Sequence, residues 1–287
     1  MDESATYFER HRAHLFGVAY RMLGMREDAE DVVQEAFLRW SRAEGTHMDS
    51  PKAWLTTVVT RLSLDRLRAA RRAREHYTGP WLPQPLVDVG RMDPTSATLE
   101  LMDDLSLAYL TLLERLGPQE RAAFLLREVY EYAYADIAGV LGKTQTACRQ
   151  LVSRARGRLG DADRARRVDR VAHERLLRSF MEAAACGDRQ GLKRLFAEDV
   201  AFTSDGGGRV YAVLRPLRGA ERVSWLFYAI ARRGGGRQYW QPASINGLPG
   251  LVRRSAGRLE AAAYFITDGS RIHAIYSVLN PVKLVHG

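Results

Sequence analysis

The chain has 287 residues, 46% of them hydrophobic, which is enough for two or three compact units. Its formal net charge of +9 favours a polyanionic partner, with nucleic acid ahead of a membrane surface. Its two cysteines lie in unrelated segments without metal-ligand spacing, which excludes a disulfide scaffold and a cysteine-ligated zinc site. No apolar run approaches the ~20 residues of a membrane span and no leader pattern opens the chain, so we expect a cytoplasmic protein without membrane contact.

Residues 1–75 are predicted to form a first all-helical domain. In "DAEDVVQEAFLRW", residues 28–40, helical spacing divides the residues between two faces. The apolar face carries Ala29, Val32, Val33, Ala36, Phe37 and Trp40. The opposite face, which we call the acidic ridge, carries Asp28, Asp31, Gln34 and Glu35. An ordinary solvated helix face is the simplest explanation of such a ridge.

The next helix is predicted to begin at Pro51, with Ser50 as its N-cap. Its C-terminal half carries a stripe of arginines that would follow a phosphate backbone, and its N-terminal half carries small polar groups. With the loop of residues 41–50, these small groups would hold an unstacked base. The candidates for this DNA contact are Lys52, Thr56, Thr57, Thr60, Arg61, Arg68 and Arg72. A solvated face is the alternative, and it is stronger for the threonines than for the arginines.

Residues 76–98 are predicted to be a linker, because they hold most of the early prolines and glycines. Trp81, Leu82, Leu86 and Val87 make this linker too apolar for a fully solvated tether. We therefore expect another part of the chain to cover it.

Residues 99–162 are predicted to form a second helical domain with a helix-turn-helix at residues 134–159. Gly142 permits the sharp turn, and the second helix opens at Thr144. Its outward face carries long donors and acceptors suited to base edges, flanked by cations suited to phosphates: Gln145, Arg149, Gln150, Ser153, Arg154 and Arg156. The alternative is a helical hairpin with a basic surface.

Residues 168–287 are predicted to be α+β. A helix containing "ERLLRSFMEAAA" ends near Gly187, and a short helix follows at "RQGLKRLF". The strand-like runs are "VAFTS", "VYAVL", "QYWQPASIN", "LEAAAYFI" and "RIHAIYSVL".

The polar candidates for chemistry in this third domain are Asp199, Asp205, Tyr264 and His273. Asp205 precedes glycines, where aspartate is ordinarily a turn residue, and no spacing fixes an acid beside a base. We expect no catalytic residue, no metal and no cofactor here. Binding of a small-molecule ligand, or docking of the linker under the tail "NPVKL", is expected instead.

Two helical DNA-binding units joined by a linker, with an acidic ridge in the first, resemble the sigma-70 family of bacterial transcription initiation factors, and its extracytoplasmic-function (ECF) group in particular. "DAEDVVQEAFLRW" is similar to region 2.2, "PKAWLTTVVTRLSLDRLRAARR" to regions 2.3 and 2.4, and "LGPQERAAFLLREVYEYAYADIAGVLGKTQTACRQLVSRARGRL" to region 4. The resemblance implies that the acidic ridge binds the β′ clamp helices of core RNA polymerase, that region 4 meets the β flap, and that the two domains read the −10 and −35 promoter elements.

The third domain resembles the SnoaL-like branch of the NTF2-like cone, and the whole chain resembles the SigJ-like group of sigma factors. The motifs of that group stand here as "WLPQP", "DGGGR" and "NPVKL", with Gln84 and Val282 in place of the usual glutamate and aspartate. The resemblance implies that the extension does the regulatory work of a separate anti-sigma protein. The expected interdomain residues are Trp81, Leu82, Pro83, Asn280, Pro281 and Leu284.

The sequence therefore predicts a sigma factor that directs core polymerase to promoters, helps melt the DNA and carries its own regulatory domain. One alternative is a one-component helix-turn-helix regulator that senses a small molecule in the cone. A second is a SnoaL-like enzyme tethered to DNA. The acidic ridge favours the sigma factor, since a simple repressor has no use for a polymerase-docking helix.

Overall fold

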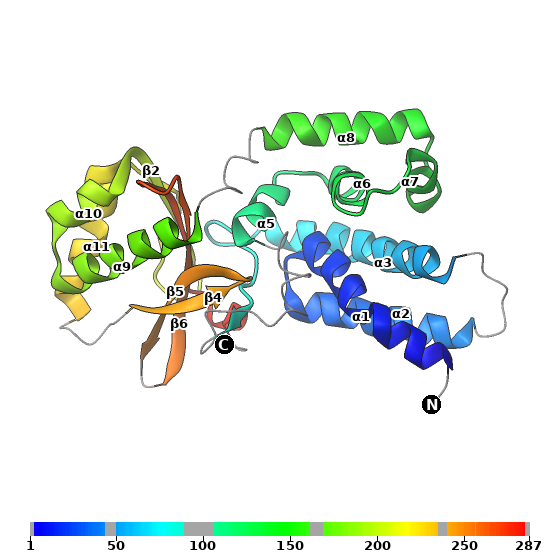
Figure 1. Cartoon of the computed structure of the whole chain (residues 1–287), viewed down its shortest axis with the longest axis horizontal. Coiled ribbons are helices and arrows are strands. Elements are labelled where there is room, and N and C mark those ends of the chain that lie inside the picture. The colour runs from blue at the N-terminus through cyan, green and yellow to red at the C-terminus, as the bar shows by residue number, and fades with distance from the viewer. Residues whose placement is uncertain are drawn as a thin grey trace. The chain divides into compact units, whose positions relative to one another are not determined.

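The computed structural model describes residues 3–43, 50–88, 106–160, 169–234, 240–255 and 257–284 (Figure 1). The chain forms two compact units. Unit 1 combines Met1–Glu75 with Tyr109–Gly160, and unit 2 combines His76–Ala108 with Asp161–Gly287. Two segments distant in sequence thus make each unit, and the linker after residue 75 belongs to the same unit as the C-terminal domain.

The described part of unit 1 is helical. Its helices are α1 (Glu3–Leu23), α2 (Arg26–Arg42), α3 (Pro51–Arg74), α5 (Leu107–Leu113, which begins at the boundary between the units), α6 (Pro118–Glu128), α7 (Tyr134–Leu141) and α8 (Gln145–Leu159). Figure 1 shows α1 and α2 side by side with α3.

Local sequence signals set the ends of the first three helices. Gly24 takes a φ of 70° between α1 and α2, a backbone conformation that glycine adopts without a steric penalty. Pro51 opens α3, and the Ser50 hydroxyl accepts a hydrogen bond from the Ala53 amide at 3.4 Å. On α2 the predicted apolar face is inside, with Ala29, Val32, Val33 and Ala36 buried.

Helices α7 and α8 form the predicted helix-turn-helix. Gly142 ends α7 in the left-handed conformation with a φ of 62°, and the Thr144 hydroxyl caps α8 by accepting from the Ala147 amide at 3.2 Å. The small core beneath them holds Ala123, Leu126, Ile137, Val140, Cys148, Leu151 and Val152. Burial in this apolar core raises the pKa of the Cys148 thiol.

Unit 2 combines a sheet with helices. Its elements are β1 (Val87–Asp88), α9 (Arg170–Cys186), α10 (Arg189–Leu195), β2 (Phe196–Asp205), β3 (Leu217–Arg218), α11 (Ala220–Gly234), β4 (Trp240–Ile245), β5 (Leu248–Ser255), β6 (Arg258–Thr267), β7 (Ile272–Val278) and a 3₁₀ turn, η2 (Pro281–Lys283).

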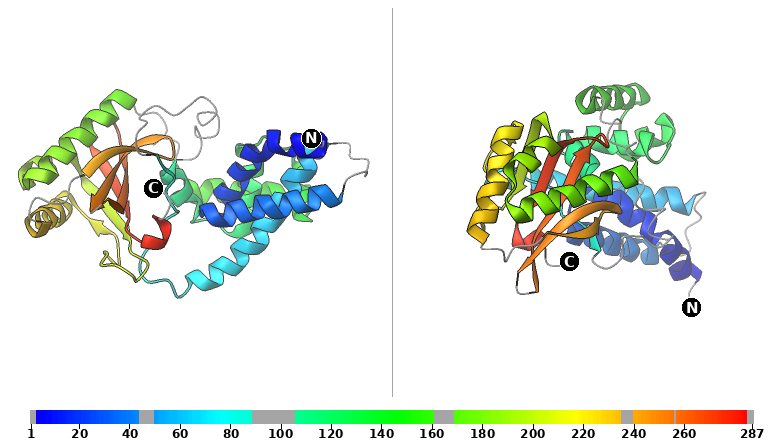
Figure 2. Two further views of the ribbon diagram at one scale, coloured as in Figure 1. Left: turned by 90° about the horizontal axis from the view of Figure 1, so that it is seen from below. Right: turned by 60° about the vertical axis from the view of Figure 1, so that its left-hand side comes forward.

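The seven strands lie in the order β1-β4-β5-β6-β7-β2-β3, with β2 and β7 parallel and the other neighbours antiparallel. Helices α9 and α11 pack on the sheet, and Figure 2 shows α9 beside the strands. At the centre of this core, the Phe180 ring of α9 contacts the rings of Phe227 at 4.9 Å and Phe265 at 5.1 Å. Strand β1, contributed by the linker, forms one edge of the sheet.

The fold class is confirmed, but several predicted elements in unit 2 differ. The run "VYAVL", residues 210–214, is not a strand, and three of its apolar side chains are exposed, Val210 at 39%, Tyr211 at 93% and Leu214 at 63%. Helix α11 and strand β5 were not predicted, although Val223, Phe227 and Ile230 show the helical spacing of α11. The predicted helix start near Leu99 lies outside the described residues.

Candidate nucleic-acid interface and linker contact

The outward face of α8 is built as the sequence predicted. All six residues predicted to contact DNA are exposed: Gln145, Arg149, Gln150, Ser153, Arg154 and Arg156. Helix α8 therefore presents polar and cationic side chains to water while its other face packs on the helix-turn-helix core.

Carboxylates of α6 bind two of these arginines, Arg154 and Arg156, and the neighbouring Arg158. Glu120 accepts from Arg154 Nε at 3.2 Å and from Arg158 Nη1 at 2.7 Å, and Glu128 accepts from Arg156 Nη2 at 2.8 Å. Burial by itself would raise the pKa of Glu120, but hydrogen bonds from the Gly117 amide and Arg154, with the charge of Arg158, outweigh it and lower that pKa. The arginines remain more than half exposed, so a phosphate can replace these partners.

The polar face of α3 differs from the prediction. Lys52, Arg61, Arg68 and Arg72 are exposed, and Thr57 is half-buried. The expectation that Thr56 and Thr60 are exposed is wrong, because they are 0% and 1% exposed. They lie one helical turn apart on a face of α3 that the protein covers, and the Thr56 hydroxyl donates to the Lys52 carbonyl at 2.9 Å. The loop expected to assist them, residues 41–50, is described only at 41–43 and at residue 50.

Arg61 binds the helix-turn-helix directly. Its Nε donates to the Val140 carbonyl at 3.0 Å and its Nη2 donates to the Gly139 carbonyl at 2.8 Å. Both carbonyls lie in the last turn of α7, where backbone oxygens have no partner within the helix. A residue predicted to contact the −10 element thus caps a helix of the second DNA-binding region.

A second set of contacts joins the same two groups of helices. Glu114, just after α5, accepts from Arg74 Nη1 at 2.6 Å and from Arg121 Nη1 at 2.8 Å. Arg121 is 2% exposed and also donates to the Met22 carbonyl at 2.8 Å, and Arg74 donates to the Leu23 carbonyl at 3.0 Å. The C-terminal end of α1 is therefore joined to α6 by Arg121 and to α3 by Arg74.

Aromatic groups complete this contact. Tyr130 accepts from Arg21 Nη1 at 2.8 Å, and its ring meets the His14 ring edge-on at 5.0 Å. Burial, together with the charges of Lys52 and other neighbours, lowers the pKa of His14 to about 4. Burial also raises the pKa of Tyr130 to about 12, although Arg21 opposes this. Both rings are thus neutral near pH 7. We call the bonds of Arg61, Glu114, Arg121 and Tyr130 the helix–helix clamp.

The acidic ridge lies on α2 as predicted, but it is not free of positive charge. Asp31 and Gln34 are exposed, and Asp28 and Glu35 are half-buried. Arg66 of α3 donates to Asp31 Oδ2 at 3.1 Å and lies 4.0 Å from Asp28 Oδ1. Burial raises the pKa of Asp28, against the opposing charges of Arg66 and Arg74. An incoming cationic surface would compete with Arg66 for the ridge.

In unit 2, the linker is held by a buried carboxylate, Asp205, at the end of β2. Asp205 Oδ1 accepts from the Tyr77 hydroxyl at 2.5 Å, and Oδ2 accepts from the Leu82 amide at 2.8 Å and from Lys283 Nζ at 2.7 Å. The Lys283 and Asp205 side chains are 3% and 0% exposed, so both charges are removed from water.

The tail closes over the same stretch of linker. Lys283 Nζ also donates to the Leu82 carbonyl at 2.5 Å and lies 3.9 Å from the centre of the Trp81 ring. The side-chain amide of Asn280 (Nδ2) donates to the Tyr77 hydroxyl at 2.9 Å. We call Tyr77, Leu82, Asp205, Asn280 and Lys283 the linker–tail cluster.

The other residues expected at this contact are placed as follows. Pro83 and Leu284 are buried, Trp81 is half-buried and Pro281 is exposed. Gln84 is buried and Val282 is 41% exposed. Sequence reasoning assigned Asp205 to a turn and did not select Lys283. A signal was available, because the motif "DGGGR" contains the acid Asp205 and the motif "NPVKL" contains the base Lys283. Since both motifs were expected at the same contact, an ion pair between these residues could have been predicted.

The glycines after Asp205 leave room for linker and tail. Gly207 has a φ of 58°, and a Cβ there would lie 2.2 Å from Asn280 Nδ2 and 3.0 Å from the Tyr77 hydroxyl. At Gly208, with a φ of 70°, a Cβ would lie 3.1 Å from Thr78 Oγ1. Side chains at these positions would meet the linker and the tail, which explains why the turn is made of glycine.

The structure does not bring the four polar candidates of this domain together. Asp199 is exposed, and Asp205 is committed to the linker. His273 lies 2.8 Å from Asp268 at the surface, and the hydrogen bonds from His273 and the Arg271 amide lower the pKa of Asp268. The Tyr264 ring stacks on Tyr276 at 4.9 Å.

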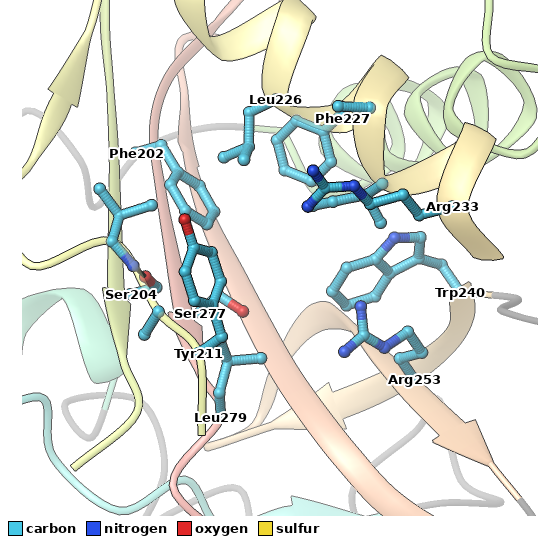
Figure 3. A pocket seen from close by; sticks show the side chains of 14 residues that line it. Phe202, Ser204, Tyr211, Leu226, Phe227, Arg233, Trp240, Arg253, Ser277 and Leu279 are labelled. Atoms are coloured by element: carbon cyan, nitrogen blue, oxygen red, sulfur yellow. Dashed lines mark hydrogen bonds between the residues drawn. The ribbon is translucent and has the colours of Figure 1, made fainter. Parts of the chain in front are cut away.

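A cavity of about 340 Å³ lies in the cone between α11 and the sheet (Figure 3). Its lining includes the hydroxyl groups of Ser204, Ser277 and Tyr211, the indole of Trp240, and the guanidinium groups of Arg233 and Arg253. Across the described ranges, no three His, Cys, Asp or Glu side chains come together as a metal site. None of the helices within those ranges is long and apolar enough to span a membrane.

Comparison with known proteins identifies both helical regions. The family model for sigma-70 region 2 matches residues 7–73, and that for sigma-70 region 4 matches residues 106–159. The ECF RNA polymerase sigma factor SigJ of Mycobacterium tuberculosis is 38% identical over 295 residues, covering 96% of this chain and 91% of that protein. The chain belongs to the ECF sigma factors of the sigma-70 family.

The similarity of this sigma factor to its relatives includes the C-terminal domain. The crystal structure of M. tuberculosis SigJ matches with a TM-score of 0.79 and 34% identity over 99% of both chains. The probable ECF sigma factor SigI of M. tuberculosis is 37% identical over 224 residues, covering 77% of this chain and 75% of that protein. These findings confirm the sigma factor and the order of its folds, and they do not support the one-component regulator.

Region 2 of this sigma factor is thus formed by α1–α3, and region 4 by α5–α8. These are the regions through which a sigma factor binds core RNA polymerase and promoter DNA. The helix–helix clamp is therefore a contact between region 2 and region 4.

Proposed function

We propose that this sigma factor is regulated by its own C-terminal domain, which holds the linker between regions 2 and 4. The buried Lys283–Asp205 pair is the observation that supports this most strongly. It binds the linker through the Leu82 backbone on both sides, at the amide and at the carbonyl. When two opposite charges are buried together, removing either one leaves the other uncompensated in the interior, which costs several kcal/mol of stability.

Promoter binding requires regions 2 and 4 to move apart. The −35 and −10 elements are about 25 base pairs apart, or roughly 85 Å of B-form DNA. With Arg61 bonded to the last turn of α7, the two regions are in direct contact and cannot span that distance. Holding the linker shortens the chain available for their separation. The described arrangement of unit 1 therefore represents a resting state, and release of the linker favours the promoter-binding state.

In the active state, each helix takes the role expected from its surface. Helix α8 reads the −35 element through Gln145, Arg149, Gln150, Ser153, Arg154 and Arg156. Helix α3 follows the −10 element through Lys52, Thr57, Arg61, Arg68 and Arg72, with Arg61 freed from α7. The acidic ridge meets the β′ clamp helices and region 4 meets the β flap. The C-terminal domain acts without chemistry of its own, and the protein works in the cytoplasm with the polymerase.

Run-off transcription tests the regulatory role. Core polymerase is combined with the wild-type chain or with Lys283→Met, on a template whose promoter has been selected in vitro with this holoenzyme. We expect Lys283→Met to give several-fold more specific transcript. The control is Lys193→Met, which removes an exposed lysine paired with Glu221 in the same unit and should leave the transcript unchanged. Equal transcript from Lys283→Met, with its linker more sensitive to protease, would rule out regulation by linker docking.

Co-elution with core polymerase tests the acidic ridge. Asp31→Arg reverses a charge that is 64% exposed and should weaken co-elution by tenfold or more, because like charges would face each other at the clamp helices. Glu9→Arg on α1 reverses a similarly exposed acid outside the ridge and serves as the control. If the two variants co-elute equally well, the ridge is not the polymerase-binding surface.

A further inference from the structure

The cavity of unit 2 has an apolar wall and a cationic side. Leu226, Phe227 and Ile230 of α11 face Phe202 of β2 and Trp240 of β4 across it. Its volume of about 340 Å³ lies at the small end of the range of ligand sites, about 300–1,000 Å³. The cavity is thus suited to a small molecule with a flat or branched apolar body.

Two arginines from different elements point into this cavity. Figure 3 shows the guanidinium group of Arg233, from α11, between Phe227 and Trp240, and that of Arg253, from β5, against the Trp240 ring on the side away from Phe227. The Arg253 guanidinium lies 5.7 Å from the centre of that ring. Among the described residues that line the cavity, no carboxylate balances them. The Arg253 side chain is 16% exposed, and its ion-pair partner Glu260 lies 3.5 Å away, outside the lining.

The environment of Arg253 leaves its charge poorly compensated. Its Nε is buried and makes no hydrogen bond among the described residues, and its ion pair with Glu260 Oε2, at 3.5 Å, is long. Burial lowers the pKa of Arg253 from its ordinary value, and Glu260 only partly opposes this. A guanidinium held away from water binds a carboxylate or phosphate through charge-assisted hydrogen bonds more strongly than a solvated one does.

Two serines add hydroxyl groups to the cavity wall. Ser204 of β2 and Ser277 of β7 are partners in the parallel register, and both are nearly fully buried. Ser204 Oγ accepts from the Val213 amide at 2.8 Å, so its own proton is available to an acceptor in the cavity. Hydroxyls and guanidinium groups around an apolar floor favour an amphipathic anion.

We propose that this cavity is a binding site for a small amphipathic anion, a carboxylate on an aromatic or branched apolar body. The apolar body lies against Phe202, Phe227 and Trp240, and the carboxylate is bound by Arg253 and Arg233. This assignment rests on charge complementarity and cavity size, and it does not depend on the regulatory role proposed for the linker.

The cavity wall is continuous with the linker–tail cluster, so a ligand would act on both. Ser204 precedes Asp205, and Leu279 of the lining precedes Asn280. The backbone amides of Leu279 and Asn280 donate to the backbone carbonyl of Asp205 at 2.8 and 2.9 Å. A bound ligand therefore contacts the residues that position the Asp205 carboxylate. The inference that ligand binding changes how firmly the linker is held rests on the proposed function. In that case the ligand is the signal that regulates the sigma factor.

Isothermal titration calorimetry on the full chain tests the site with a matched pair of probes. The first probe is 2-naphthoate, and the second is 2-naphthamide, which has the same shape without the charge. We expect 2-naphthoate to bind at least tenfold more tightly. Arg253→Gln and Arg233→Gln should each weaken 2-naphthoate about 10- to 100-fold and leave 2-naphthamide unchanged. The control is Arg232→Gln, an exposed neighbour on α11 that does not line the cavity.

Equal affinity for the two probes, no binding of 2-naphthoate at millimolar concentration, or an equal loss of affinity in Arg232→Gln would refute the proposed anion site.

Chymotrypsin cleavage of the linker at Tyr77 and Trp81, with and without 2-naphthoate, tests whether ligand binding is coupled to linker binding. A change in cleavage that Arg253→Gln abolishes supports it. Binding without a change in cleavage would keep the site and refute its link to the linker.

Discussion

The linker–tail cluster and the helix–helix clamp both join segments far apart in sequence, but they differ in their exposure to water. In the cluster, Lys283 and Asp205 are 3% and 0% exposed and bind each other and the linker. In the clamp, Arg121 is buried, but Arg61 is exposed and, within the described ranges, binds backbone oxygens of α7.

This difference implies different strengths and different roles. Removing one partner of a fully buried ion pair leaves an uncompensated charge, whereas an exposed arginine exchanges its partners for water at little cost. The linker contact should therefore behave as a switch with two states, and the clamp as a weaker contact that opens once the linker allows it. Three variants and one change of pH test this ranking, from the largest expected effect to the smallest.

Lys283→Met should have the largest effect. The buried Asp205 carboxylate loses its counter-charge, which costs about 3–5 kcal/mol in the free energy of unfolding of unit 2. The measurement is urea unfolding, with chymotrypsin cleavage at Tyr77 and Trp81 as a report on the linker. Lys193→Met, at an exposed pair, should cost under about 1 kcal/mol. Similar losses of unfolding free energy in the two variants would show that the buried ion pair stabilises the protein no more than an exposed one.

Gly207→Ala should destabilise the same contact by crowding it. Its Cβ would meet Asn280 Nδ2 at 2.2 Å, in addition to the strain of a φ of 58°. Gly257→Ala is the matched control, because it has a φ of 78° and no atom within 4 Å of the added Cβ. We expect a loss of about 1 kcal/mol for Gly257→Ala and about 2–3 kcal/mol for Gly207→Ala in urea unfolding. Equal losses would mean that only the backbone strain matters.

Acidification should weaken the clamp through His14. Its folded pKa of about 4 lies below its ordinary value of 6.5, so the unfolded chain binds a proton that the folded chain excludes. Stability from this group is complete above pH 6.5 and falls as the pH drops toward 4. Allowing for partial solvent screening, we expect unit 1 to lose about 1–2 kcal/mol between pH 7 and pH 4.5.

Circular dichroism of the helical transition in urea measures this loss. His14→Gln should flatten the pH dependence, while His273→Gln, at the surface of unit 2, should keep it. A wild-type slope in His14→Gln would assign the pH dependence to other groups.

Arg61→Ala should have the smallest effect. It removes two hydrogen bonds to the α7 carbonyls, one part-buried and one exposed, together worth about 1 kcal/mol, and should speed hydrogen exchange in α7 about fivefold. Arg68→Ala removes a neighbouring exposed arginine that pairs with Asp65 on its own helix, and should leave α7 unchanged. Unchanged exchange in Arg61→Ala would mean that the clamp does not depend on this residue.

Much of the helical half could be predicted because its signals are local. Spacing placed Val32 and Val33 inside, and Gly142 with Thr144 located the turn and the cap of the recognition helix. The same spacing gave α3 several polar faces without showing which one the fold would cover. Thr56 and Thr60 were assigned to the DNA side for that reason, and packing by other helices placed them inside.

The centre of unit 2 could not be predicted from local signals. Lys283 and Asp205 are 78 residues apart, and their pairing depends on the fold of the intervening sheet. Aspartate before glycines does mark a turn, as expected, but nothing in that pattern indicates that the carboxylate is buried. The family motifs pointed to a contact between linker and tail without identifying its charged centre.

The short pairing of β1 with β4 has a consequence for the released state. Val87 and Asp88 of the linker cover the outer side of Ile245 and Ser244, and β4 has only β5 on its other side. When the linker leaves, β4 becomes an open edge whose unpaired amides and carbonyls invite another extended chain. Unless polymerase or DNA binds the activated protein promptly, two copies should associate through this edge. Release of the linker would thus activate the sigma factor and lower its solubility.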